Sequence, residues 1–318
     1  MLAFVVAALL GSSGPQSPPP AVPQAEPTQQ SSADAASVRL EDVEITGQRD
    51  DMVRAFVETV AAPNRHRGMA RWASDICIGV ANLRPEGARY IVDRVSTVAE
   101  DVGLKPGEPG CAPNVIIIAS TSPDALAAEL VQDRRRAFLM GGPGMDRGRA
   151  ALDAFVNSDQ PVRWWQVSMP TNVDTGAPAV RLPGDCQGTC SSAADFAPVN
   201  RVVAGSRLAL PIIDNLFRTV IILDVDQVSR VSIRQLADYL AMISLTQVDP
   251  DADTGAYVSV LNVFDDPAST DGLSDWDEAY LHGLYQTVQV RRSPIAARSA
   301  LSDSIRRARE RLDTGTRD

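Results

Sequence analysis

Three polar residues of types that can bind or catalyse lie close together in one predicted helix. Gln235 and Tyr239 are four residues apart and therefore share a helical face, and Asp238 precedes Tyr239. An amide, a carboxylate and a phenol can all hydrogen-bond a ligand, but an amide and a phenol are poor ligands for zinc. With Asn262 and His282 further along the chain, these residues predict a shallow ligand-binding cleft.

A hydrolase is the alternative function that these residue types leave open. Its catalytic groups would be Asp224, Asp238 and His282, because carboxylates and histidines serve as general acids and bases. The chain has one other histidine, His66, in the polar stretch PNRHRG, where we expect it to be exposed. Two histidines so far apart in the sequence do not make a conventional zinc site. We therefore expect His282, on a helix rich in aromatic residues, to pack half-buried.

The acidic stretch DPDADTG, residues 249–255, invites comparison with a calcium-binding loop. An EF-hand loop requires glycine at its sixth position and glutamate at its twelfth. Here Gly255 falls one position late, and the twelfth position is Val260. The stretch therefore predicts a solvated acidic turn.

A strand and a capped helix must position the polar residues of the helix. The run from Arg218 to Asp226 is rich in β-branched residues and has the length of a strand. Ser232 and Gln235 form a capping box at the start of the helix. Apolar residues then recur at intervals of three and four, which predicts one buried face. They are Ile233, Leu236, Ala237, Leu240 and Ala241.

The upstream part of the chain predicts a βαβ unit. Residues 76–83 form a strand, Pro85 opens a helix that closes near Gly103, and residues 114–120 form a second strand, parallel to the first. Further helices are predicted over 52–61, 124–133 and 294–312, and further strands over 38–49, 162–169 and 207–213. The whole pattern predicts a single α/β domain.

From Phe217 to Gln286 the chain runs through a strand, a helix, the segment VSVLNVFDD and a second helix, LSDWDEAYLHGLYQ. This order resembles the zincin fold of metalloproteases and, more narrowly, a group of secreted bacterial proteins whose zincin-like domain is degenerate. In an active zincin the helix reads HExxH, in which two histidines hold zinc and the glutamate activates water. The matching positions here are Gln235, Leu236, Ala237, Asp238 and Tyr239. The resemblance therefore implies a zincin-like mixed sheet with packing helices, and a pseudoenzyme without a metal or another cofactor.

The four cysteines predict two structural disulfides. Cys77 and Cys111 each lie near the start of a predicted strand, and these starts are close together if the strands are neighbours. Cys186 and Cys190 are four residues apart in DCQGTC, where the glycine permits a tight turn. These two pairings are favoured over crossed pairing. Metal binding by the second pair is the alternative, which a lone CxxxC supports weakly.

The N-terminal residues predict export from the cytoplasm. Residues 2–10, LAFVVAALL, have the length of a signal-peptide core but lack a preceding basic residue. We assign residues 1–37 to a signal peptide and a disordered Pro/Ser/Ala-rich leader, 38–313 to the zincin-like domain and 314–318 to a disordered tail. The alternative is an apolar disordered start on a cytosolic protein.

Charge and composition narrow the choice of partners. A net charge of −10 argues against nucleic acid and against a polybasic membrane anchor. No stretch has the roughly 20 apolar residues that a transmembrane helix needs. We expect a periplasmic or secreted, non-catalytic module that binds a protein or peptide of the cell envelope or serves the envelope structurally. An inert spacer is a further alternative.

Overall fold

The computed structural model describes residues 40–64, 67–140, 145–173, 175–180, 191–192, 212–287 and 294–315. The chain divides into two compact units, Met1–Val43 and Glu44–Asp318, and the fold described below belongs to the second. Within the described ranges, no helix combines the length and the apolar character that crossing a membrane would require.

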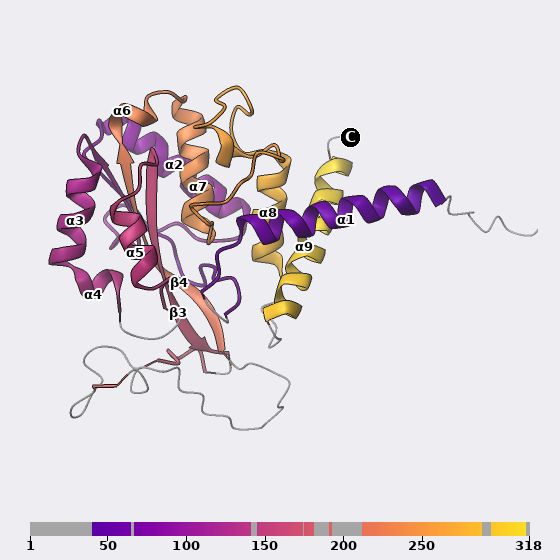
Figure 1. Cartoon of the computed structure of the whole chain (residues 1–318), viewed down its shortest axis with the longest axis horizontal. Coiled ribbons are helices and arrows are strands. Elements are labelled where there is room, and N and C mark those ends of the chain that lie inside the picture. Colours follow the sequence, from indigo (N-terminus) through magenta and orange to yellow (C-terminus); the bar gives the residue numbers. More distant parts are fainter. Residues whose placement is uncertain are drawn as a thin grey trace, which may run out of the picture. The chain divides into compact units, whose positions relative to one another are not determined.

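The described residues form a mixed sheet of four strands in the order β1-β2-β4-β3. Figure 1 shows β3 and β4 side by side. The strands are β1 (Ile78–Ala81), β2 (Val115–Ser120), β3 (Val162–Asn172) and β4 (Ile212–Asp224). β1, β2 and β4 are parallel, and β3 runs antiparallel to β4. Helix α2 (Pro85–Asp101) connects β1 to β2. The predicted βαβ unit and the α/β fold class are thus confirmed.

Each face of the sheet carries an apolar cluster. Ile221 and Leu223 of β4 belong to the larger cluster, and Val220 and Ile222, which alternate with them, belong to the smaller one. The larger cluster is completed by α1 (Leu40–Val60), α2, α7 (Ile233–Leu245), α8 (Asp275–Gln286) and α9 (Pro294–Gly315). The smaller cluster is completed by α3 (Pro123–Asp133), α4 (Arg135–Phe138) and α5 (Arg149–Val156).

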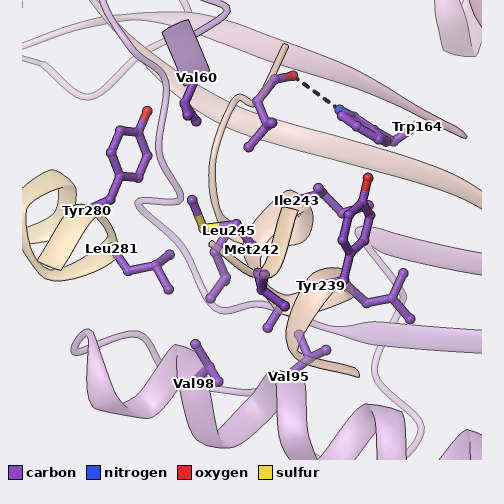
Figure 2. Packing of buried hydrophobic residues seen from close by; sticks show 14 of the residues in the cluster. Val60, Val95, Val98, Trp164, Tyr239, Met242, Ile243, Leu245, Tyr280 and Leu281 are labelled. Atoms are coloured by element: carbon purple, nitrogen blue, oxygen red, sulfur yellow. Dashed lines mark hydrogen bonds between the residues drawn. The ribbon is translucent and has the colours of Figure 1, made fainter. Parts of the chain in front are cut away.

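Helix α7 is enclosed by the larger cluster. Its start has the predicted capping box between Ser232 and Gln235, and every residue from Gln235 to Leu245 is buried. Val95 and Val98 of α2 lie on one side of the helix, and Trp164 of β3 lies on another (Figure 2). The prediction of a single buried face is therefore too narrow.

Ile233 departs from the predicted apolar face of α7. Its side chain is 45% exposed. It occupies the first position of the helix, where the chain has not yet entered the core.

One predicted strand is wrong, and a second is tested only at its C-terminal end. Residues 40–49 belong to α1 rather than to a strand. The apolar residues Val53, Phe56, Val57 and Val60 recur at helical spacing and pack in the core. Extending this helix towards the N-terminus adds a hydrogen bond for each residue, whereas a separate strand would need its own partner. Ile212 and Ile213, at the end of the strand predicted over 207–213, do form a strand, but this strand is β4, which lies between β2 and β3 rather than at the edge of the sheet. Residues 207–211 lie outside the described ranges.

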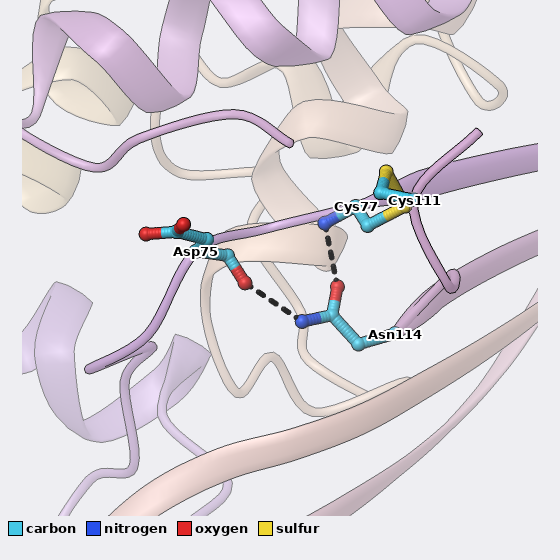
Figure 3. The surroundings of a disulfide bond; sticks show 4 residues. All are labelled: Asp75, Cys77, Cys111 and Asn114. Carbon is cyan, nitrogen blue, oxygen red and sulfur yellow. Dashed lines mark hydrogen bonds between the residues drawn. A yellow bond between two sulfur atoms is a disulfide. The ribbon is translucent and has the colours of Figure 1, made fainter. Parts of the chain in front are cut away.

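The predicted disulfide between Cys77 and Cys111 is present, with a Cα–Cα distance of 6.1 Å. Asn114 fixes its surroundings: the side chain accepts a hydrogen bond from the backbone N–H of Cys77 (2.8 Å) and donates one to the carbonyl of Asp75 (2.9 Å) (Figure 3). The proposed partners Cys186 and Cys190 lie outside the described residues, as does His66.

The α8–α9 contact yields a stability prediction, because Gly283 of α8 lies directly against the backbone of α9. A methyl group at position 283 would lie 2.8 Å from the Cα atom of Ile305. We expect Gly283→Ala to lower the free energy of unfolding by about 1–3 kcal/mol through overpacking. Urea denaturation measures the change.

The matched control is Gly87→Ala in α2, where no heavy atom lies within 4 Å of the added methyl group. Alanine there is expected to be neutral or to stabilise by up to about 1 kcal/mol. Equal effects of the two substitutions would contradict the close α8–α9 contact.

Candidate functional site

A pocket of about 510 Å³ lies beside α7, between β3 and the loop that joins α7 to α8. We call it the Tyr239 pocket. Its aromatic lining residues are Trp164, Tyr239 and Tyr257, and its acidic ones are Asp249, Asp253, Asp265 and Asp266. The other lining residues are Gln160, Val248, Pro250, Ala252, Thr254, Gly255, Ala256, Val258, Leu261, Asn262 and Ser269. The pocket thus combines aromatic rings with carboxylates.

Tyr239 forms the inner wall of this pocket and is only 8% exposed. Its ring packs edge-on against Phe264 at 5.0 Å and against Trp164 at 6.2 Å between centroids. The Trp164 indole donates a hydrogen bond to the Val248 carbonyl at 3.3 Å, which fixes the neighbouring wall (Figure 2).

The Tyr239 hydroxyl is available to a ligand. Within the described part of the chain it makes no hydrogen bond, and unlike the Tyr280 hydroxyl it is not sealed inside the core. Burial raises the pKa of Tyr239, and the nearby negative charge of Asp265 acts in the same direction. The phenol is therefore protonated at neutral pH and can both donate and accept a hydrogen bond.

Asn262 also lines the pocket, but its side chain holds the surrounding loop together. Its amide donates to the carbonyls of Thr254 (3.1 Å) and Tyr257 (2.8 Å), and its carbonyl accepts from the Thr254 hydroxyl. Asn262 therefore shapes the wall on which Tyr257 lies.

Gln235 does not line the pocket, and its side chain holds two segments of the chain together. Its side-chain oxygen accepts from the N–H of Ser232 (2.9 Å) in the capping box. Its side-chain nitrogen donates to the carbonyls of Pro267 and Thr270, each at 2.7 Å. This one amide therefore joins the start of α7 to the loop that carries Asp266 of the pocket wall.

Asp238 is likewise engaged in holding the fold. Its side chain is fully buried, forms an ion pair with Arg94 of α2 and accepts a hydrogen bond from the N–H of Leu273 at 3.1 Å. These contacts connect α2, α7 and the approach to α8.

The residues considered for hydrolysis are held by different partners. Asp224 caps the short helix α6 (Val225–Val228), and a hydrogen bond from the Gln227 side chain lowers its pKa. His282 on α8 is half-buried, as predicted. Burial lowers its pKa, and the negative charge of Asp101 opposes this effect. Among the residues described, no hydrogen bond or ion pair joins Asp224, Asp238 and His282 to one another.

The sequence analysis missed Trp164, Tyr257 and the four carboxylates of the pocket as site residues. The available signal was the acidic stretch 249–255 followed by the pair Asp265 and Asp266. Asp253 is exposed in the structure, and Asp249 pairs with Arg147 at 3.0 Å. No three histidine, cysteine, aspartate or glutamate side chains in the described ranges converge closely enough to hold a metal ion.

Comparison with known proteins identified no relative of this chain. No protein-family model matches the chain, and neither the curated proteins nor the solved structures include one significantly similar to it.

Proposed function

We propose that this protein is a non-catalytic binding module of the cell envelope that takes part of a peptide or protein partner into the Tyr239 pocket. The observation that carries the proposal is the hydroxyl of Tyr239, which stands on a largely buried ring, has no partner among the described residues and borders an open pocket. A hydroxyl that opens onto a pocket from an otherwise buried ring can donate a hydrogen bond to a ligand and accept one from it.

Binding rather than catalysis is supported by the engagement of the other polar residues. Gln235 donates its hydrogen bonds to the loop between α7 and α8, and Asp238 forms an ion pair with Arg94. These residues occupy the positions of the catalytic motif in the zincin resemblance. The order of β4, α7 and α8 on a mixed sheet supports our further proposal that the domain is a degenerate zincin.

An envelope location is supported by two features of the chain. The disulfide between Cys77 and Cys111 is typical of an oxidising compartment. The apolar stretch 2–10 has the composition of a signal-peptide core.

A blocking substitution tests the proposed binding site. Ala256 is exposed and lines the pocket, so Ala256→Trp is expected to fill the pocket without disturbing the core. Ala128 on α3 is also exposed but lies outside the pocket lining, so Ala128→Trp is the matched control. The probes are acetyl-Gly-X-Gly-amide peptides in which X is Arg, Lys, Gln, Glu, Leu or Phe.

Saturation-transfer difference NMR with the full chain measures binding of each peptide. We expect at least one peptide to bind the wild type and the Ala128→Trp variant equally, and to lose its signal with Ala256→Trp. If Ala256→Trp weakens no peptide more than Ala128→Trp does, the proposed binding function is wrong.

A further inference from the structure

We infer that the Tyr239 pocket binds an organic cation, either a guanidinium or an alkylammonium group, such as the side chain of arginine or lysine. This inference rests on the binding function proposed above and names the chemical class of its ligand. It depends on three features of the pocket, namely its uncompensated charge, its aromatic walls and the spacing of its carboxylates.

The charge of the pocket is negative and largely uncompensated. Four aspartates line it, whereas no lysine, arginine or histidine does so among the described residues. Of these four aspartates, only Asp249 has a basic partner in the described ranges, namely Arg147 at 3.0 Å. The Asp253 carboxylate accepts the N–H of Gly255 at 3.2 Å, and the Asp266 carboxylate accepts the N–H of Ala268 at 3.1 Å.

Asp265 is the carboxylate best placed to meet a cation. It is exposed, and no hydrogen bond or ion pair from the described part of the chain reaches its side chain. It nevertheless lies close enough to Tyr239 for its charge to act on the phenol. A cation bound between the two would gain an ion pair at Asp265 and a hydrogen-bond acceptor at the Tyr239 oxygen.

The aromatic walls favour an organic cation. Tyr239, Trp164 and Tyr257 all line the pocket, and the negative face of an aromatic ring attracts guanidinium and ammonium groups. Tyr239, a residue only 8% exposed, borders this space and has an accessible hydroxyl without a partner among the described residues. It is an independent sign that a polar ligand group belongs there.

The spacing of the carboxylates disfavours a bare metal ion as the ligand. A calcium site gathers six to eight oxygen ligands at about 2.3–2.6 Å from the ion. In the described ranges no three acidic side chains converge in this way. The aspartates are instead spread around about 510 Å³, which has room for a charged head group and its aliphatic stem.

A charge-neutralising substitution tests the inference. Asp265→Asn keeps the size of the side chain and removes its charge, and Asp271→Asn removes the same charge from an exposed residue of the same loop outside the pocket lining. We expect Asp265→Asn to weaken the Arg and Lys peptides about tenfold. Asp271→Asn is expected to change their affinity less than about twofold, because salt screens exposed charges. Titrations followed by NMR at 0.15 M salt measure both.

The peptide series separates failure of this inference from failure of the binding function. If the Gln, Glu, Leu or Phe peptide binds as tightly as the Arg and Lys peptides and Ala256→Trp abolishes that binding, the pocket binds ligands but the cation inference is wrong. If Ala256→Trp abolishes no binding, both are wrong. Equal loss of affinity in Asp265→Asn and Asp271→Asn also overturns the cation inference.

Two further probes identify the source of the cation. Agmatine and choline carry a guanidinium and a quaternary ammonium group without a peptide. Tighter binding of either one than of the Arg peptide would support the cation inference and assign the pocket to a free amine. Binding of calcium chloride that Asp265→Asn abolishes, with no binding of any peptide or amine, would overturn the inference.

Discussion

The Asp277→Ala substitution is expected to lower the free energy of unfolding by about 3–5 kcal/mol. Asp277 is fully buried at the start of α8 and accepts four hydrogen bonds. Two come from Ser274, through its N–H (2.9 Å) and its hydroxyl (2.8 Å). The others come from the Ser259 hydroxyl (2.6 Å) and the Val260 N–H (2.8 Å). Alanine would leave the buried Ser259 hydroxyl and Val260 N–H without this acceptor, whereas the Ser274 hydroxyl would keep the Val258 carbonyl at 2.6 Å.

Loss of the Asp277 carboxylate should also disturb the wall of the Tyr239 pocket. Val260 opens the short helical turn Val260–Asn262, and Asn262 lines the pocket. Urea denaturation measures the stability change, with Asp275→Ala as the control. Asp275 is exposed in the same first turn of α8 and contributes about 0.3–1 kcal/mol through the helix dipole. Similar losses for the two variants would contradict the role assigned to Asp277.

Removing the disulfide with the double substitution Cys77→Ala and Cys111→Ala is expected to cost about 3–4 kcal/mol. The cysteines are 34 residues apart in the sequence, and closing a loop of that length restricts the unfolded chain by about this free energy. The bond joins the residues that lead into β1 and β2, so the edge of the sheet should loosen first.

Urea denaturation with and without a reductant measures the contribution of this disulfide. The reductant should destabilise the wild type by about 3–4 kcal/mol more than it destabilises the double variant. An equal effect of the reductant on both proteins would show that the bond between Cys77 and Cys111 contributes nothing to stability.

Features of the fold that depend on neighbouring residues could be predicted from the sequence. The capping box of Ser232 and Gln235 uses residues three apart, and the predicted start of α7 is confirmed. The parallel pairing of β1 and β2 follows from a strand, a helix and a strand in succession, because such a crossover has one preferred hand. The pairing of Cys77 with Cys111 could be predicted because the two cysteines lie near the starts of these neighbouring strands.

Features that depend on distant residues could not be predicted in this way. Asp238 has the appearance of a site residue in the sequence, but Arg94, its partner, precedes it by 144 residues. Trp164 lies at the pocket only because β3 pairs with β4. The two strands are far apart in the sequence, and no local pattern encodes their pairing. The strand predicted over 38–49 is wrong at residues 40–49, because they continue the helix predicted after them at 52–61.

The enclosure of α7 determines where this protein can acquire new specificity during evolution. A residue that touches neighbours on every side can rarely be exchanged without loss of packing, and α7 is buried from Gln235 to Leu245. The loop of residues 249–272, by contrast, presents exposed side chains such as Asp253, Ala256 and Asp265. Related sequences should therefore diverge along this rim while the helix behind it stays nearly unchanged.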